Sequence, residues 1–401
     1  MQPLSPAEAA LTAAIDPAPM LARVEAWSAI NTGTRNLAGL AAQAGALAEA
    51  FSTLPGELGF ADPAPVDAMG ADGRVVPLQH GRHLVVRVRP QASRRLLLTG
   101  HMDTVFASDD PFQDLTWHDG ETLNGPGVAD MKGGLAVILA ALAAFEASPA
   151  AAAVGYDVMV NSDEETGSLS SAALIAELAA GKVAALTYEP SARPDGTLAG
   201  ARGGSGNFSA VVAGRAAHAG RNPGWGRNAV VAAADLALRL KAMESSGLAL
   251  NPARIEGGAA NNVVPDHAVL RFNIRPRDTA DAERFDHAIW GILHDVESEH
   301  EVGIVLHGGI TRPPKPLSDE ALRLFELVKA CGAALGQPIA WQPSGGVCDG
   351  NNIAACGVPV VDTMGVRGGA IHSADEYLLV PSLGERAALS ALVLHRLAGG
   401  E

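Results

Sequence analysis

Histidines and carboxylates follow several short apolar segments of this chain, at points where a strand would end. Residues 96–103 read LLLTGHMD, so His101 and Asp103 come directly after a predicted buried strand. A His followed two residues later by an Asp is typical of a metal-bound imidazole that a carboxylate orients. An isolated pair of this kind is more often polar loop surface, so a metal site requires further ligands.

Three more carboxylates occupy comparable positions. Asp130 precedes an apolar helix predicted from residue 133, where capping that helix is its alternative role. Glu164 and Glu165 belong to the acidic loop DEETGS, which follows a strand predicted over 156–161. As an isolated motif this loop would be solvated, with Ser168 capping the next helix.

Another carboxylate and a second histidine complete the set. Glu189 follows a strand predicted over 183–187, and His372 follows a strand and two glycines. Because open α/β sheets bind ligands at the carboxyl ends of their strands, we expect these side chains to converge. Two imidazoles and three carboxylates suit two borderline divalent ions, zinc best, with one carboxylate shared. The predicted metal ligands are His101, Asp130, Glu165, Glu189 and His372, which leaves Glu164 as a general base.

The ordered segments GHMDTVF, NGPGVADMKGG, DEETGS, YEPS, HAG and HSADEY resemble the M20 family of metallopeptidases, and within it the glutamate carboxypeptidase (carboxypeptidase G) branch. The resemblance implies two Zn2+ per subunit, with Co2+ or Mn2+ as alternatives. It assigns His101, Asp130 and Glu189 to one ion and Asp130, Glu165 and His372 to the other. It also implies that Asp103 orients His101, that Glu164 activates the attacking water, and that the peptide after Asp130 is cis.

Further residues are implied by the resemblance alone. His218, in RAAHAGRNP, matches a histidine that stabilises the oxyanion in the partner subunit's active site, and Asn262, in ANNVVPD, matches a second donor. Arg275 and Arg312 match basic residues that hold a substrate carboxylate, for which an Arg fork is well suited. Without the resemblance, each of these side chains would be interpreted as solvated surface.

The expected activity is that of a two-zinc metallo-exopeptidase or amidohydrolase acting on a small peptide or N-acyl amino acid. It would cleave the amide bond of a C-terminal amino acid, with Glu as one candidate. The alternative is an N-acyl-amino-acid deacylase of the aminoacylase, acetylornithine deacetylase or succinyl-diaminopimelate desuccinylase type. There are two remote alternatives. One is a zinc-free thiol hydrolase that uses Cys348, Asp349 and a His. The other is a non-catalytic binding relative, against which the presence of Glu164 argues. Cys348, in GGVCDGNN, departs from the family pattern and leaves substrate choice open.

Composition restricts the partners. The 401-residue chain has 29 Lys and Arg against 44 Asp and Glu, a net charge of −15, which argues against nucleic acid and anionic membranes. Its three cysteines form no CxxC motif, so neither a disulfide framework nor a Cys-rich zinc site is expected. The N-terminal segment has no signal-peptide pattern and the apolar run 135–145 is too short to span a bilayer, so we expect a cytoplasmic protein.

The order of predicted elements divides the chain into domains. Strands and helices alternate between residues 84 and 187, which predicts a parallel α/β sheet in which strands 84–88 and 95–99 pair. Between 207 and 307 the order strand, helix, strand, strand, helix, strand is ferredoxin-like α+β. We therefore expect a discontinuous, zinc-peptidase-like α/β/α catalytic domain over 1–202 and 314–401. The resemblance makes the insert, 203–313, a lid and homodimerisation domain.

Overall fold

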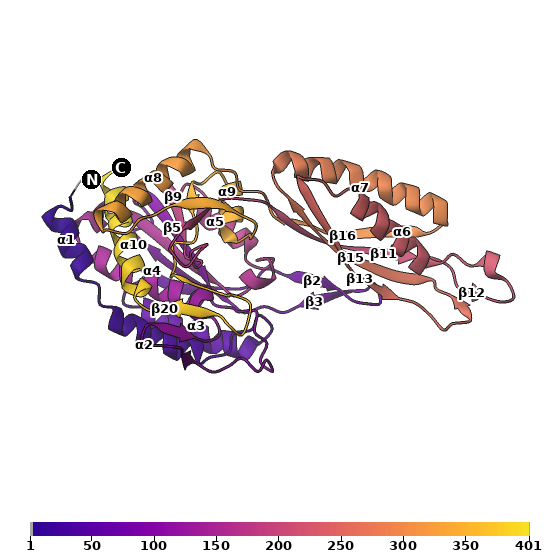
Figure 1. Ribbon diagram of the computed structural model, residues 1–401, viewed down its shortest axis with the longest axis horizontal. Coiled ribbons are helices and arrows are strands. Elements are labelled where there is room, and N and C mark those ends of the chain that lie inside the picture. The colour runs from indigo at the N-terminus through magenta and orange to yellow at the C-terminus, as the bar shows by residue number, and fades with distance from the viewer. Residues whose placement is uncertain (1–2, 401) are drawn as a thin grey trace. The chain divides into compact units, whose positions relative to one another are not determined.

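The protein, seen here as a computed structural model that describes residues 3–400, forms two compact units (Figure 1). The larger unit comprises the chain up to Ala64, Gln79–Ala201, and the chain from Leu317 onward. The smaller unit comprises Pro65–Leu78 and Arg202–Pro316.

A hairpin of β2 (Val66–Met69) and β3 (Val75–Leu78) belongs to the smaller unit, although the sequence placed it in the catalytic domain. Its tip is bound to a strand of the smaller unit, because Arg271 donates to the Met69 carbonyl at 2.7 Å and His267 contacts the Ala71 carbonyl at 3.2 Å. The smaller unit is therefore built from two segments of the chain, and the prediction of one continuous insert is wrong.

A six-stranded sheet forms the centre of the larger unit. Its order is β1 (Glu57–Ala61), β4 (His83–Val88), β8 (Gly155–Asn161), β5 (Arg95–His101), β9 (Ala184–Thr187) and β18 (Val360–Val361). The strands from β8 to β18 are parallel, as expected, whereas β4 and β1 are antiparallel to their neighbours. The predicted pairing of β4 with β5 is wrong, because β8 lies between them.

Helices cover both faces of this sheet. Successive residues of β5 alternate between the faces, so Leu98 and Leu97 belong to different apolar clusters. The cluster of Leu98 includes residues of α2 (Pro17–Ser28), α3 (Leu37–Phe51), α4 (Gly134–Glu146), α8 (Asp319–Ala334) and α10 (Ser382–Gly399). The cluster of Leu97 includes residues of α5 (Ala172–Ala179) and α9 (Asp349–Ala355). A further helix, α1 (Pro6–Ala13), packs against α4 and α10.

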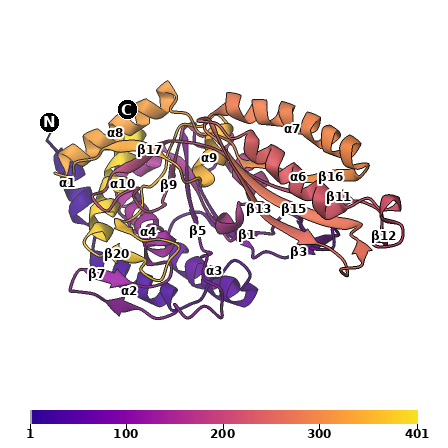
Figure 2. The same ribbon diagram turned by 45° about the vertical axis from the view of Figure 1, so that its right-hand side comes forward.

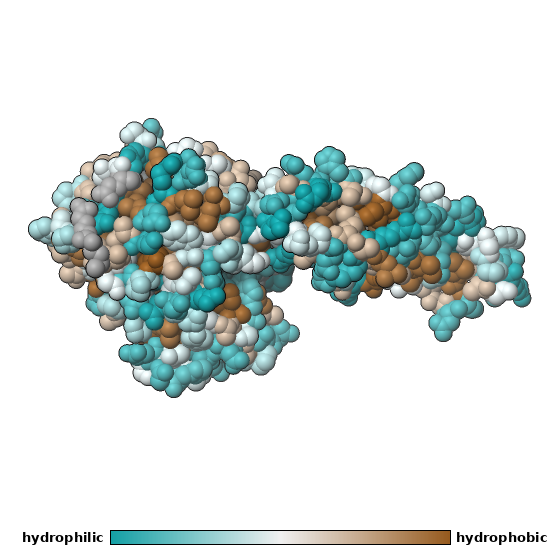
Figure 3. Space-filling model, turned by 45° about the horizontal axis from the view of Figure 1, so that its top comes forward, coloured by the Kyte–Doolittle hydropathy of each residue, from teal (hydrophilic) through white to brown (hydrophobic). Residues whose placement is uncertain are grey.

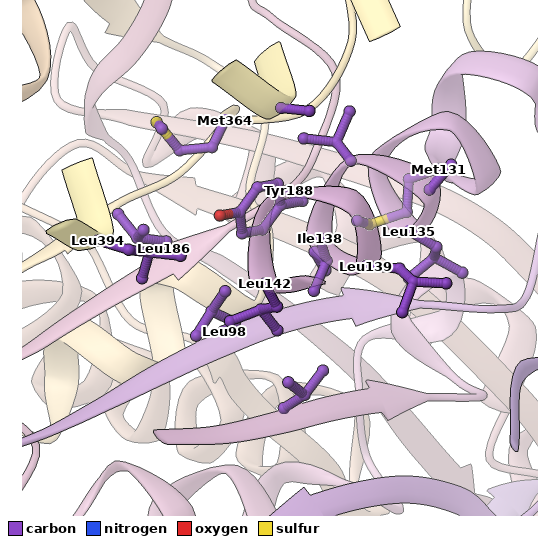
Figure 4. Packing of buried hydrophobic residues seen from close by; sticks show 14 of the residues in the cluster. Leu98, Met131, Leu135, Ile138, Leu139, Leu142, Leu186, Tyr188, Met364 and Leu394 are labelled. Atoms are coloured by element: carbon purple, nitrogen blue, oxygen red, sulfur yellow. The ribbon is translucent and has the colours of Figure 1, made fainter. Parts of the chain in front are cut away.

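Helix α4 is apolar around most of its circumference, and most of its residues are buried. Figure 4 shows Leu142 of α4 directed toward Leu98 of β5. By length and composition the segment Val128–Glu146 could cross a membrane, but 89% of its apolar 18-residue stretch is buried inside the structure. A buried core helix passes the same test, so the composition is weak evidence for a membrane span.

Short elements complete the larger unit and position the candidate site. A small sheet has the order β19 (Gly368–Gly369), β20 (Tyr377–Leu379), β7 (Thr122–Asn124) and β6 (Thr116–Trp117). It holds the C-terminal segment beside the loop that leads to Asp130, since Asn124 donates to the carbonyls of Ala374 and Glu376. The remaining elements are η1 (Val128–Gly133), η2 (Pro149–Ala153), η3 (Glu164–Thr166), β10 (Leu198–Arg202) and β17 (Trp341–Ser344).

The smaller unit has the predicted ferredoxin-like order. Its elements are β11 (Ser205–Ala213), α6 (Ala229–Ala242), β13 (Leu248–Gly257), β15 (His267–Pro276), α7 (Thr279–His300) and β16 (Gly303–Arg312). The sheet order is β13-β15-β11-β16, and α6 and α7 lie on the same side of it (Figure 2). β12 (Ala217–His218), η4 (Pro223–Trp225) and β14 (Val263–Val264) lie between these elements in the chain. On the face drawn in Figure 3, hydrophobic residues form small patches among hydrophilic ones.

The packing of α4 on β5 predicts a large difference between two leucine substitutions. Leu98 is fully buried, so Leu98→Ala should lower the free energy of unfolding by roughly 2–5 kcal/mol. Leu238 of α6 is 72% exposed, so Leu238→Ala should change it by less than about 0.5 kcal/mol. Urea denaturation measures both, and equal losses would contradict this account of the core.

Candidate metal centre

Two imidazoles contact one carboxylate at the carboxyl end of the parallel strands. His101 is the last residue of β5, and its Nε2 lies 3.1 Å from Asp130 Oδ1. His372, on the loop between β19 and β20, places its Nε2 3.2 Å from Asp130 Oδ2. Each oxygen of Asp130 thus faces a different imidazole. Its alternative role as a helix cap is not realised, since the N-cap of α4 is Gly133.

A second carboxylate lies beside each imidazole. Glu189 Oε2 is 3.6 Å from His101 Nε2, and Glu165 Oε2 is 3.1 Å from His372 Nε2. Two ligands of one tetrahedral zinc, with bonds of about 2.0–2.2 Å, lie roughly 3.3 Å apart. The five side chains therefore converge as predicted, with the donor types and spacing that suit two ions sharing Asp130.

The charges of this cluster suit a cation. Contacts with Asp130 and Glu165 raise the pKa of His372 to about 11. Burial, together with the Asp130 carboxylate, raises the pKa of Glu165 to about 7. Burial lowers the pKa of His101, but the neighbouring carboxylates, Glu189 first, outweigh it and hold that pKa well above its ordinary value. A bound cation would compete with protons for these imidazoles.

Asp103 positions the acidic loop rather than only the histidine. His101 Nδ1 lies 2.9 Å from the backbone carbonyl of Asp103 and 3.5 Å from its carboxylate. The buried carboxylate accepts the backbone N–H groups of Glu164 and Glu165, at 3.1 and 3.2 Å, and the Thr34 hydroxyl at 2.7 Å. Asp103 therefore joins the end of β5 to the loop that presents both glutamates.

Glu164 lies at the edge of the cluster. One oxygen of its carboxylate belongs, with ligand atoms of His101 and Glu189, to a group whose members are all within 4.8 Å of one another. Its side chain is intermediate in exposure, whereas His101 is buried. Glu164 could therefore contact a water molecule bound beside the imidazole of His101.

A buried carboxylate that the sequence pattern did not reveal positions Asp130. Glu376 Oε1 accepts the backbone N–H groups of Ala129 and Asp130, both at 3.0 Å. Burial and the nearby Asp130 raise the pKa of Glu376 to about 8. Glu376 lies inside the motif HSADEY, but a sequence does not show that one of its two adjacent acids is buried. The peptide between Asp130 and Met131 is cis, as expected.

The segment 345–352 supports the acidic loop instead of offering a nucleophile. Asp349 accepts hydrogen bonds from Asn161 and from Ser168, so Ser168 does not cap the next helix, whose N-cap is Ser171. Cys348 is buried, and its thiol donates to the Asp362 carboxylate at 3.6 Å. A carboxylate beside a thiol opposes thiolate formation, so this setting does not suit a thiol nucleophile.

The four other predicted residues belong to the smaller unit and form two groups. His218 and Asn262 are exposed near one end of its sheet, where Ala219 N–H donates to the Asn262 carbonyl. Arg275 and Arg312 lie at the other end of the sheet, at the end of β15 and of β16. Arg275 is exposed and donates to Asn273, whereas Arg312 is buried.

His218 has a defined tautomer. Its Nδ1 accepts the backbone N–H groups of Gly220 and Arg221, both at 3.1 Å. A neutral imidazole that accepts at Nδ1 carries its proton on Nε2, and the side chain is exposed. His218 therefore presents an N–H donor at its Nε2.

Comparisons with known proteins identify the family to which this chain is similar. The model of peptidase family M20/M25/M40 matches residues 97–396. Carboxypeptidase G2 of Pseudomonas sp. (strain RS-16) is 31% identical over 93% of this chain and 88% of its own length. Succinyl-diaminopimelate desuccinylase of Halorhodospira halophila (strain DSM 244 / SL1) is 31% identical over 71% of this chain and 78% of its own length. The crystal structure of a tripeptidase from Staphylococcus aureus has a TM-score of 0.74 and 21% identity, covering 96% of this chain and all of the other, and so shows the same fold.

The contacts of Asp103 predict a cost in stability. Asp103→Ala leaves the partly buried N–H groups of the glutamate loop without their buried acceptor, so it should lower the free energy of unfolding by about 2 kcal/mol. Asp119 also accepts two backbone N–H groups, but in an exposed turn, so Asp119→Ala should have a much smaller effect. Urea denaturation measures both variants, and equal effects would show that burial of the Asp103 contacts is unimportant.

Proposed function

Since the chain belongs to peptidase family M20/M25/M40 and is a hydrolase of that family, we propose that it uses two divalent ions to cleave an amide bond beside a free carboxylate. The substrate is a small peptide with a cleavable C-terminal amino acid, or an N-acyl amino acid. One observation carries this proposal: the two oxygens of Asp130 face two imidazoles, each with a further carboxylate beside it.

The metal ligands are divided between the two ions. His101, Asp130 and Glu189 would hold one zinc, and Asp130, Glu165 and His372 the other. When bound, the ions polarise the scissile carbonyl and lower the pKa of the attacking water. Asp103 and Glu376 keep the ligands in place, because they bind the backbone on either side of the cluster.

Glu164 is the proposed general base. Its carboxylate lies within 4.8 Å of the ligand atoms of His101 and Glu189, but it is left out of the two ligand sets. It can take a proton from the attacking water and give it to the leaving amine. The Nε2–H of His218 and the side chain of Asn262 would stabilise the oxyanion.

The free carboxylate of the substrate is assigned to Arg275 and Arg312. In the smaller unit these arginines lie at the end of the sheet opposite to His218, so a single subunit divides the two tasks between two places. The resemblance, in which this histidine acts in the partner's active site, supports a homodimer through the smaller unit.

Two substrate classes remain to be distinguished. The similarity to carboxypeptidase G2 supports removal of a C-terminal amino acid, with Glu as one candidate. The similarity to succinyl-diaminopimelate desuccinylase supports removal of an acyl group from an amino acid. A panel that varies the acyl group and the C-terminal amino acid independently separates the classes. The part that all of the best substrates have in common is the part that the enzyme recognises.

The shared carboxylate predicts how the protein binds metal. Wild-type protein loaded with zinc and desalted should contain about two zinc ions per chain and unfold at a higher temperature than metal-free protein. Asp130→Asn should lose most of the zinc and most of this shift, since both sites use Asp130. Elemental analysis and calorimetry measure these effects, with Asp119→Asn, in an exposed turn, as the matched control. Two tightly bound ions in Asp130→Asn would refute the shared-ligand arrangement.

The general-base assignment predicts a separation of chemistry from metal binding. Glu164→Gln should lower kcat on the best amide of the panel by at least about 100-fold. Its zinc content should stay at the wild-type value, because Glu164 is outside both ligand sets. Steady-state kinetics and elemental analysis test this, and unchanged turnover would exclude Glu164 as the base. Full activity after complete removal of metal would refute the proposed function itself.

A further inference from the structure

A cleft within the larger unit borders the candidate metal centre. It has a volume of about 460 Å³, within the range of small-molecule sites. Its lining includes Thr34, Arg35, Thr104, Ser108, Glu165 and Thr166. Glu165 belongs both to this lining and to the predicted metal ligands, so a group bound in the cleft would lie beside the candidate metal centre.

Arg35 is the cationic side chain of this lining, and the turn that carries it is fixed. Asn31 joins the turn to the cleft's other wall, because its amide donates to the Phe106 and Ala107 carbonyls. Asn36 caps α3 by accepting the Gly39 N–H. Hydrogen bonds of Asn31 and Asn36 therefore fix the backbone on both sides of Arg35.

The guanidinium of Arg35 is held by neutral groups. Its Nη1 lies 3.1 Å from His80 Nε2 and 3.4 Å from the Gln79 carbonyl. Over the described residues 3–400 these are its hydrogen bonds, so the Nε and Nη2 donors are available to a ligand. These two donors form the fork that binds a carboxylate bidentately.

Two buried carboxylates attract Arg35 while their own oxygens are engaged elsewhere. Asp103 accepts from Thr34 and the glutamate loop, and Asp163 accepts from Ser170 and Ser171. Asp109 also lines the cleft and is exposed, so an anion is expected at the Arg35 end and away from Asp109.

We propose that Arg35 determines specificity by binding a carboxylate on the acyl part of the substrate. The inference rests on the proposed function, in which arginines of the smaller unit take the carboxylate of the leaving amino acid. A second anion held beside Glu165 then belongs to the other side of the scissile bond. The substrate class is an amino acid whose amine carries a short dicarboxylic acyl group.

The test compares two acyl groups on one leaving amino acid. N-succinyl-glutamate and N-succinamoyl-glutamate differ only in a terminal carboxylate or amide. Wild-type zinc-loaded enzyme should prefer the succinyl compound in kcat/KM, and Arg35→Met should lower the succinyl-to-succinamoyl ratio by roughly 10- to 100-fold. Arg35→Lys should keep part of the preference. Arg87→Met is the matched control, because Arg87 is an exposed arginine of β4 paired with Glu177, and its ratio should equal that of wild type.

The outcomes separate the inference from the proposed function. A ratio unchanged by Arg35→Met, or a wild-type preference for the succinamoyl compound, overturns the role of Arg35 while amide hydrolysis stands. If the enzyme hydrolyses neither compound nor any amide of the panel, the proposed function fails. Calorimetric titration of zinc-loaded protein with succinate then still tests Arg35, since binding should weaken at least about tenfold in Arg35→Met and not in Arg87→Met. Equal binding in the three proteins overturns the inference.

Discussion

One carboxylate shared between two imidazoles is the interaction on which the site depends. Asp130 comes from the segment before α4, His101 from the end of β5 and His372 from the C-terminal loop, so three distant parts of the chain meet at one side chain. Excess negative charge at this point requires a positive partner, which a proton or a divalent ion supplies. The surrounding structure keeps these groups together in spite of their repulsion.

Backbone hydrogen bonds to buried carboxylates provide that restraint. Glu376 binds the peptide groups at Asp130, and Asp103 binds those of the glutamate loop. Farther from the imidazoles, Asp349 accepts hydrogen bonds from the side chains of Asn161 and Ser168, which flank the same loop. The acids at this edge of the sheet are therefore of two kinds, those that face the two imidazoles and those that hold the backbone around them, and the second kind explains why so many carboxylates are gathered there.

The local pattern predicts the convergence of these side chains well and the groups that support them poorly. His101, Glu165 and Glu189 follow apolar segments, and parallel strands bring such positions to one edge, so their convergence could be foreseen. The order of the strands could not, because the pairing of β8 between β4 and β5 depends on tertiary contacts that no short segment records. Glu376 was missed for a related reason, since burial distinguishes it from neighbouring acids and burial is a property of the folded chain.

Because of the hairpin of β2 and β3, the smaller unit cannot be exchanged or removed as one continuous segment of the chain. The chain crosses between the units at four points, after Ala64, Leu78, Ala201 and Pro316, so no single excision separates them. Removing 202–316 alone would also remove Arg271, whose side chain binds the tip of the hairpin. A chimaera that exchanges this unit must therefore replace both segments of the chain together.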